Sequence, residues 1–255
     1  MSPLPFLISI PHGGKKIPEE LKFRTDLSRE DILEDGDAFT SQIYDLTPYC
    51  RVIKTPIARA FIDLNRAPDM LPPDYPDGVV KSQTCYQKPV YIKDREPDNQ
   101  MIALLIEKYY SPYYQRIEEM VSAGDVVFGF DCHTMAAVAP PISTLSGEKR
   151  PTINLGNAGG TACDAYPVQL LANCFRNVFG LSEREVTINT PFSGGEIVRF
   201  FGRNPIPWIQ IEMNRNLYMT PPWFNSETWQ IDQRRLQKLS ALILEGLTRF
   251  TRVLR

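Results

Sequence analysis

Short, mostly apolar runs alternate along the chain with longer segments in which apolar residues recur every three to four positions. The run at residues 4–10, which ends at Pro11, is typical of a strand buried on both faces, as in a parallel sheet. Further runs predict strands or extended segments at residues 50–55, 60–63, 126–131, 185–189 and 206–213.

The longer segments predict helices at residues 28–46, 99–121, 164–178 and 229–254. Pro112 predicts a kink or a break in the second of these, because proline has no amide proton to donate inside a helix. Strands that alternate with helices predict a single α/β domain over residues 1–255, with a mixed, largely parallel sheet flanked by helices. Ligands of such sheets bind beyond the carboxyl ends of the strands.

Composition narrows the class of protein. Hydrophobic residues make up 43% and charged residues 23%, as in a folded, water-soluble protein. The net charge of -2 argues against a nucleic-acid partner, and no apolar run approaches the roughly 20 residues of a membrane span. The N-terminal run lacks the positive charge and length of a signal peptide, and the 5 scattered cysteines form no CxxC pair. We therefore expect a cytoplasmic protein with no membrane partner and with reduced thiols.

The chain contains only 2 histidines, and their positions indicate where a catalytic site would form. His12 follows the run 4–10, His133 follows the run 126–131, and Glu212 ends the run 206–213. Because parallel strands end at one edge of a sheet, we expect these side chains to converge there, with both histidines just past their strands and Glu212 at the end of its strand. Two histidines and one carboxylate, with one position open to water, make a common catalytic zinc set. Asp37 is the predicted third ligand, with Asp35 as the alternative.

A zinc ion in such a site lowers the pKa of water from about 9 to near 7 and polarises a carbonyl. Glu212 is then the predicted general base. Other roles remain open at this point: a structural histidine, Asp37 as a helix cap, or Glu212 as an ion-pair partner of Arg215 or Arg66. A thiol mechanism at Cys132 is disfavoured, because neighbours in an extended segment point to opposite faces.

Arginines near these motifs predict an acidic small-molecule substrate, since a guanidinium binds a carboxylate bidentately. Arg59, Asn65 and Arg66 form one candidate binding group, and Arg199, close to the glycines at 194–195, forms a second candidate anion site. Surface ion pairs and an ordinary turn are the alternatives. The segment 68–89 is rich in proline, aspartate and glycine and predicts a lid or a wall of the pocket.

The ordered set of motifs resembles the N-formylglutamate amidohydrolase family. The matching stretches are residues 10–14 (IPHGG), 35–37 (DGD), 63–66 (DLNR), 131–135 (DCHTM), 191–195 (PFSGG) and 210–219 (QIEMNRNLYM). The resemblance implies a fold like that of zinc carboxypeptidases, in the phosphorylase/hydrolase-like class. It also implies zinc-dependent hydrolysis of N-formyl-L-glutamate to formate and L-glutamate, the last step of one route of histidine degradation. The family order implies that His12, Asp37 and His133 bind the metal and that Glu212 is catalytic.

Three positions depart from the family pattern and bear on the acyl group and the amino acid. Gly13 stands where the family usually has serine, Tyr114 where many members have histidine, and Pro207-Trp208 where a His-Ala pair is frequent. Two alternatives therefore stay open: a carboxypeptidase-like hydrolase of short peptides or cell-wall fragments, and a non-catalytic anion-binding protein on the same fold. No pattern indicates the oligomeric state.

Overall fold

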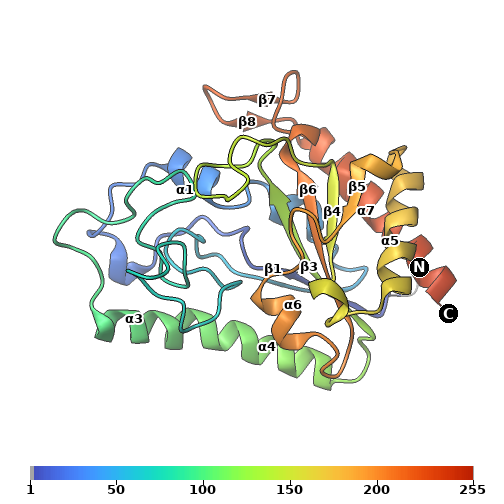
Figure 1. Cartoon of the computed structure of the whole chain (residues 1–255), viewed down its shortest axis with the longest axis horizontal. Coiled ribbons are helices and arrows are strands. Elements are labelled where there is room, and N and C mark those ends of the chain that lie inside the picture. Colours follow the sequence, from blue (N-terminus) through green and yellow to red (C-terminus); the bar gives the residue numbers. More distant parts are fainter. Residues whose placement is uncertain (1–2, 255) are drawn as a thin grey trace.

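Six strands form one mixed sheet in the computed structural model, which describes residues 3–254 (Figure 1). The strands are β1 (Phe6–Ile10), β2 (Arg51–Lys54), β3 (Phe128–Met135), β4 (Ile153–Gly156), β5 (Val186–Ile188) and β6 (Trp208–Asn214). Their order across the sheet is β2-β1-β3-β6-β4-β5. All neighbours run parallel except β4 and β6, which are antiparallel. The mixed, largely parallel sheet predicted from the sequence is therefore confirmed.

Two differences from the predicted strands concern short segments. The run 60–63 forms turns and no strand, and β4 was not predicted. A strand of four residues is too short to show a periodicity, and β4 is held by its ladder to β6, which depends on residues far along the chain. A small separate hairpin, β7 (Phe224–Asn225) and β8 (Gln230–Ile231), precedes the last helix.

Helices cover both faces of the sheet (Figure 1). One face packs against α2 (Thr40–Tyr44), α5 (Ala165–Phe179) and α7 (Gln233–Leu254) in one hydrophobic core. The other face packs against α4 (Ser111–Ser122) and α6 (Glu196–Phe201) in a second core. The burial of every residue of β1, β3 and β6 follows from these two layers. No helix within residues 3–254 combines the length and the apolar character needed to cross a lipid bilayer.

The predicted break at Pro112 is confirmed. The helical segment consists of α3 (Asn99–Leu105), a π-helical turn η2 (Ile106–Tyr110) and then α4. Pro112 lies at the start of α4, where its missing amide proton interrupts the regular hydrogen-bond ladder.

The predicted helix at residues 28–46 is split in two, and the split matters for the site. α1 (Arg29–Asp35) begins with a capping box at Ser28 and ends before Gly36, and α2 starts only after Phe39, whose φ is 65°. The turn between them brings Asp37 to the edge of the sheet, where the Asp37 amide donates to the carbonyl of His12 at 3.1 Å. The last helix also begins later than predicted, at Gln233, because residues 230–231 pair in the small hairpin.

Side-chain alternation along β3 and β6 separates the core from the site. Phe130 and Cys132 of β3 belong to the core beneath α5 and α7, whereas Asp131 and His133 point to the opposite face. Burial raises the pKa of the Cys132 thiol well above its usual range. The thiol of Cys132 therefore lies away from His133, as the sequence predicted, and is poorly suited to act as a nucleophile.

Candidate active site

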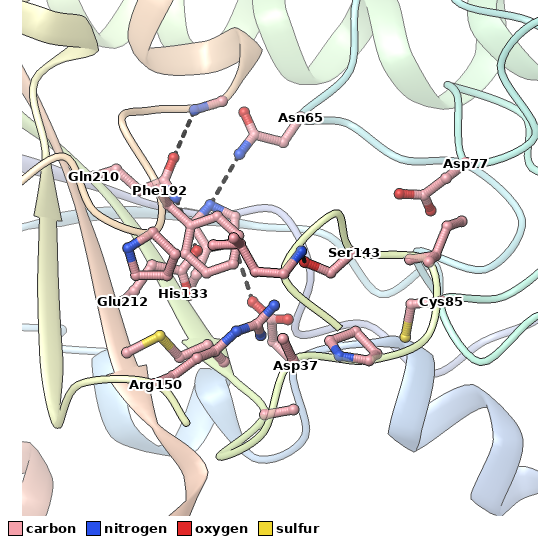
Figure 2. A pocket seen from close by; sticks show the side chains of 18 of the residues that line it. Asp37, Asn65, Asp77, Cys85, His133, Ser143, Arg150, Phe192, Gln210 and Glu212 are labelled. Atoms are coloured by element: carbon pink, nitrogen blue, oxygen red, sulfur yellow. Dashed lines mark hydrogen bonds and ion pairs between the residues drawn. The ribbon is translucent and has the colours of Figure 1, made fainter. Parts of the chain in front are cut away.

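A cavity of about 1430 Å³ opens at the carboxyl end of the parallel strands (Figure 2). Its lining includes the side chains of His12, Asp37, His133 and Glu212. The segment 68–89 contributes a wall, through residues 70, 74–77 and 85–86, in line with the prediction that it lines a pocket. One predicted detail is wrong: His133 lies inside β3 and not past its end, because β3 remains paired with β6 as far as Met135.

Three buried ligand atoms meet on the floor of this cavity. The Nδ1 atom of His133 lies 3.1 Å from Nδ1 of His12 and 3.0 Å from Oδ2 of Asp37, and the third separation, His12 Nδ1 to Asp37 Oδ2, is 3.6 Å. A tetrahedral zinc ion with bonds of about 2.0–2.1 Å would separate its ligand atoms by roughly 3.3 Å. The three residues could therefore hold one metal ion.

The remaining histidine nitrogens explain why the Nδ1 atoms face inward. Nε2 of His12 lies 2.7 Å from the Asp63 carboxylate, and Nε2 of His133 lies 2.7 Å from the Asp131 carboxylate. An ionised carboxylate only accepts, so both Nε2 atoms donate, and a neutral imidazole then carries its lone pair on Nδ1. Two lone pairs and a carboxylate within about 3 Å repel one another unless a cation lies between them. This donor set fits a divalent metal.

The turn at Asp37 is held by contacts from distant segments. Oδ2 of Asp37 accepts from the amide of Thr134 at 3.1 Å, and Oδ1 lies 3.3 Å from Nη2 of Arg215. Arg215 also donates to the carbonyl of Gly36. Burial by itself would raise the pKa of Asp37, but the contacts of its carboxylate with His12 and His133 lower that pKa well below its usual range. Asp37 is therefore an anion at neutral pH.

Glu212 is placed beside the histidines by strand register. In the β3–β6 pair, His133 lies directly opposite Glu212, and Asp131 lies opposite Gln210. Gln210 donates to Oε1 of Glu212 at 2.8 Å and accepts from the Gly195 amide at 2.6 Å. Burial raises the pKa of Glu212 to about 7, against the opposing effect of His133. A carboxyl group with such a pKa can take up and release a proton near neutral pH.

The ion-pair alternatives for Glu212 are not found. Arg215 pairs with Asp37, and Arg66 pairs with Asp77 at 2.9 Å. Over residues 3–254, no ion pair joins Glu212 to an arginine or lysine. Its carboxylate is therefore free on the side that faces the cavity.

Asp35, the alternative to Asp37, belongs to a different cluster. Both of its oxygens accept from Nζ of Lys81, at 2.9 and 3.0 Å, and one accepts from the Cys85 amide at 2.7 Å. Asp35 and Lys81 are almost completely buried. Asp35 is therefore not a member of the candidate metal-binding group, which consists of His12, Asp37 and His133.

The two arginines of the first candidate binding group line the cavity but are paired within the protein. Nε of Arg59 donates to Asp63 at 2.8 Å, and its Nη2 lies 3.6 Å from Asp77. Arg66 shares the carboxylate of Asp77. Both arginines thus pair with aspartates of the protein itself, Asp63 behind His12 and Asp77 in the wall of the cavity.

Asn65 occupies an interior position next to His133. Its Nδ2 lies 3.0 Å from Oδ2 of Asp131 and 3.0 Å from Nε2 of His133, and its Oδ1 accepts from the Ile197 amide at 2.9 Å. Only 4% of Asn65 is exposed. By donating to Asp131, its amide helps to hold the aspartate that positions His133.

Arg199 lies at the rim of the cavity, exposed to solvent. Nη2 of Arg199 lies 3.3 Å from Oγ of Ser193, on the loop that carries the glycines 194–195. Gly195 has a structural reason to lack a side chain, because an added Cβ would meet the Asn65 amide at 2.2 Å.

Sequence reasoning missed the polar residues behind the site. Asp131 and Gln210 each precede a predicted site residue by two positions on a strand, so the period of two places them on the same face and could have indicated them. Asp63 reaches His12 only through the tertiary fold. Arg150, which also lines the cavity, carries no motif that could have indicated it.

Comparisons with known proteins bear on the family and the fold of the chain. The model of the family N-formylglutamate amidohydrolase matches residues 4–219. The chain is 28% identical to the N-formylglutamate deformylase of Pseudomonas putida, over 98% of this chain and 96% of the relative. Its fold is similar to a crystal structure of N-formylglutamate amidohydrolase from Ralstonia eutropha JMP134, with a TM-score of 0.79 at 21% identity, covering 99% and 94% of the two chains. A gene product of Agrobacterium tumefaciens shows the same fold at 14% identity, with a TM-score of 0.70 and coverage of 98% and 91%.

Proposed function

We propose, starting from the fact that the chain belongs to the N-formylglutamate amidohydrolase family, that it hydrolyses N-formyl-L-glutamate to formate and L-glutamate. The observation that carries this proposal is the convergence of His12, Asp37, His133 and Glu212 in one cavity. The name of the Pseudomonas putida relative supports the substrate. The product chemistry would suit the end of one route of histidine degradation.

Zinc is the metal that we propose for the site, with His12, Asp37 and His133 as its ligands. When bound, such an ion would polarise the amide carbonyl and favour ionisation of the attacking water. The hydrogen bonds from the histidines to Asp63 and Asp131 support this assignment, because such partners orient imidazole ligands and raise their basicity.

Glu212 is the proposed general base. It removes a proton from the attacking water, the oxygen adds to the carbonyl carbon, the carbon–nitrogen bond breaks, and Glu212 delivers the proton to the leaving nitrogen. Gln210 occupies one carboxylate oxygen, so the proton travels through the other. The pKa of Glu212 near 7 supports both halves of this exchange.

The four predicted substrate-binding residues receive different proposed roles. Arg199 is exposed at the rim and is proposed to contact the substrate directly. Arg59, Asn65 and Arg66 are engaged with Asp63, Asp131 and Asp77, so they are proposed to act mainly by holding the wall and the histidines in place.

Hydrolysis assays and metal analysis test the proposal together. Protein purified without chelator should contain about one ion per chain and release L-glutamate from N-formyl-L-glutamate faster than it cleaves N-acetylated amino acids or dipeptides. Removal of the metal should abolish turnover, and added zinc should restore it. Faster cleavage of dipeptides would favour the carboxypeptidase-like alternative. Protein that retains too little metal, and that added metal does not activate, would favour the non-catalytic alternative.

A further inference from the structure

One half-buried arginine of the cavity, Arg150, has no counter-charge among residues 3–254. Arg59, Arg66 and Arg215 each lie within 3.3 Å of an aspartate oxygen. The guanidinium of Arg150 makes no hydrogen bond or ion pair with any residue of the described range 3–254, and its Nε atom is buried. Leaving a buried polar group unpaired costs free energy, so the arrangement calls for a partner that the chain itself does not supply.

The backbone of Arg150 is fixed. Its amide donates to the carbonyl of Ala137 at 3.0 Å, and its carbonyl accepts from Nδ2 of Asn214, the last residue of β6, at 3.1 Å. The guanidinium lies over the ring of Phe192, with 4.8 Å between Cζ and the ring centroid. Figure 2 shows Arg150 reaching into the cavity, and the charge of Glu212 acts on its guanidinium. Both ends of the residue are thus positioned before any ligand binds.

We propose that Arg150 is a specificity-determining residue that binds one carboxylate of the substrate. A guanidinium offers two parallel N–H donors that match a carboxylate, and stacking on Phe192 holds its plane in one orientation. The site then selects an N-acyl amino acid with an acidic group over a neutral one of the same size. This inference rests on the proposed function, because it assigns a role within the same cavity.

The other unpaired cations of the cavity are less suited to this role. Lys149, Arg184 and Arg199 line its rim and are exposed. Water and salt screen an ion pair at such positions, so it discriminates weakly between substrates. Arg150 is half-buried, and burial lowers its pKa while the nearby Glu212 opposes that effect. An ion pair with Arg150 would therefore be screened less than one at the rim.

Kinetics on two variants and a matched control test the inference. Arg150→Met removes the positive charge. Arg150→Lys keeps the charge but loses the two parallel N–H donors of the guanidinium. The control, Lys149→Met, removes an exposed charge from the adjacent residue. Arg150→Met should raise KM for N-formyl-L-glutamate about 10–100-fold and leave the metal content unchanged. The KM of Arg150→Lys should lie between that of Arg150→Met and that of the wild type. Lys149→Met should change KM by less than about threefold.

Substrate analogues show which carboxylate of the substrate Arg150 binds. The wild type should prefer N-formyl-L-glutamate over its γ-amide (N-formyl-L-glutamine) or over its α-amide, and Arg150→Met should lose that preference for one of the two. An unchanged KM and an unchanged preference in Arg150→Met would overturn the inference while leaving the proposed function intact.

A binding measurement separates the two proposals. Glutarate, a dicarboxylate without an amide bond, should bind the metal-loaded wild type and Lys149→Met alike by calorimetry, and Arg150→Met at least 10-fold more weakly. If the wild type fails to hydrolyse N-formyl-L-glutamate but this pattern of glutarate binding holds, the proposed function fails and the role of Arg150 stands. If glutarate binds all three proteins equally, or does not bind the wild type, the role of Arg150 is wrong.

Discussion

At the scale of single residues, both histidines of the site have the same arrangement of hydrogen-bond partners. Each histidine directs Nδ1 into the cavity and Nε2 to a buried aspartate, Asp63 for His12 and Asp131 for His133. The aspartates are themselves held, Asp63 by Arg59 and Asp131 by Ser9 at 3.0 Å. The orientation of the two histidines, which are candidate metal ligands, therefore depends on residues that lie behind them.

Replacement of Glu212 tests the base at this scale. Glu212→Gln keeps the size and the hydrogen bond from Gln210 but cannot accept the proton of water. We expect the metal content to stay the same and kcat/KM to fall about 10²–10⁴-fold. The control is Glu148→Gln, which changes an exposed residue in the lining of the same cavity and should leave kcat/KM nearly unchanged. Near-normal turnover of Glu212→Gln would place the base elsewhere.

The buried pair of Lys81 and Asp35 gives a stability prediction. Both side chains have a relative exposure of 0%, and the ammonium group lies 2.9 Å from Oδ1 of Asp35. Lys81→Met leaves the carboxylate buried without its partner, so the free energy of unfolding should fall by about 3–5 kcal/mol. The control Lys88→Met removes a lysine that is 46% exposed and should cost less than about 1 kcal/mol.

A second variant keeps that prediction testable. Asp35→Asn combined with Lys81→Met removes both charges and should recover part of the loss in chemical denaturation. A double variant that is less stable than Lys81→Met alone would show that the missing charge is not the cause of the destabilisation.

At the scale of elements, the register of β3 against β6 brings together two candidate site residues, His133 and Glu212. His133 lies opposite Glu212, and both strands have their next polar residue two positions earlier, so the supporting pair Asp131 and Gln210 also lies opposite. A slip by one residue would turn all four side chains into the apolar core. The cores on both faces of the sheet exclude that slip.

Packing of α7 against α5 gives a prediction at this scale. Gly246 is buried in the middle of α7, and a Cβ there would lie 2.5 Å from the ring of Phe175. Helix propensity favours alanine by about 1 kcal/mol, but the clash should outweigh it and make Gly246→Ala less stable by about 1–3 kcal/mol. Lys238→Ala, at an exposed position of the same helix, should be close to neutral. A stabilised Gly246→Ala would mean that the two helices can separate at little cost.

At the scale of the whole molecule, the candidate metal ligands connect distant parts of the chain. His12 follows β1, Asp37 lies between α1 and α2, and His133 lies in β3. The unfolded chain has no such arrangement, so a bound ion stabilises the folded state selectively.

The melting temperature should therefore depend on free zinc. When free zinc is at 100 times its Kd, the free energy of unfolding should rise by about 2.7 kcal/mol, and a chelator should remove this gain. His12→Asn should lose this dependence, whereas Asp125→Asn, which changes an exposed residue paired with Arg51, should keep it. A wild type whose melting temperature is the same with zinc and with chelator would contradict the proposed metal site.

The sequence by itself determined five of the six strands of the sheet, the break at Pro112 and the candidate residues His12, Asp37, His133 and Glu212. Periodicity and motif order are local properties, and each of these features depends on residues close together in the chain. The choice of Asp37 over Asp35 required the turn between α1 and α2 and the position of Lys81, which no local pattern encodes.

Only the tertiary structure decided which charges are already neutralised. Arg59 and Arg66 lie close to Asn65 in the sequence, and no local pattern shows that Asp63 and Asp77 pair with them. Arg150 lies in no recognised motif, and its guanidinium has no partner within residues 3–254. Ion pairing depends on distances of a few ångströms between segments far apart along the chain. These distances appear only when the sheet and the two layers of helices have formed.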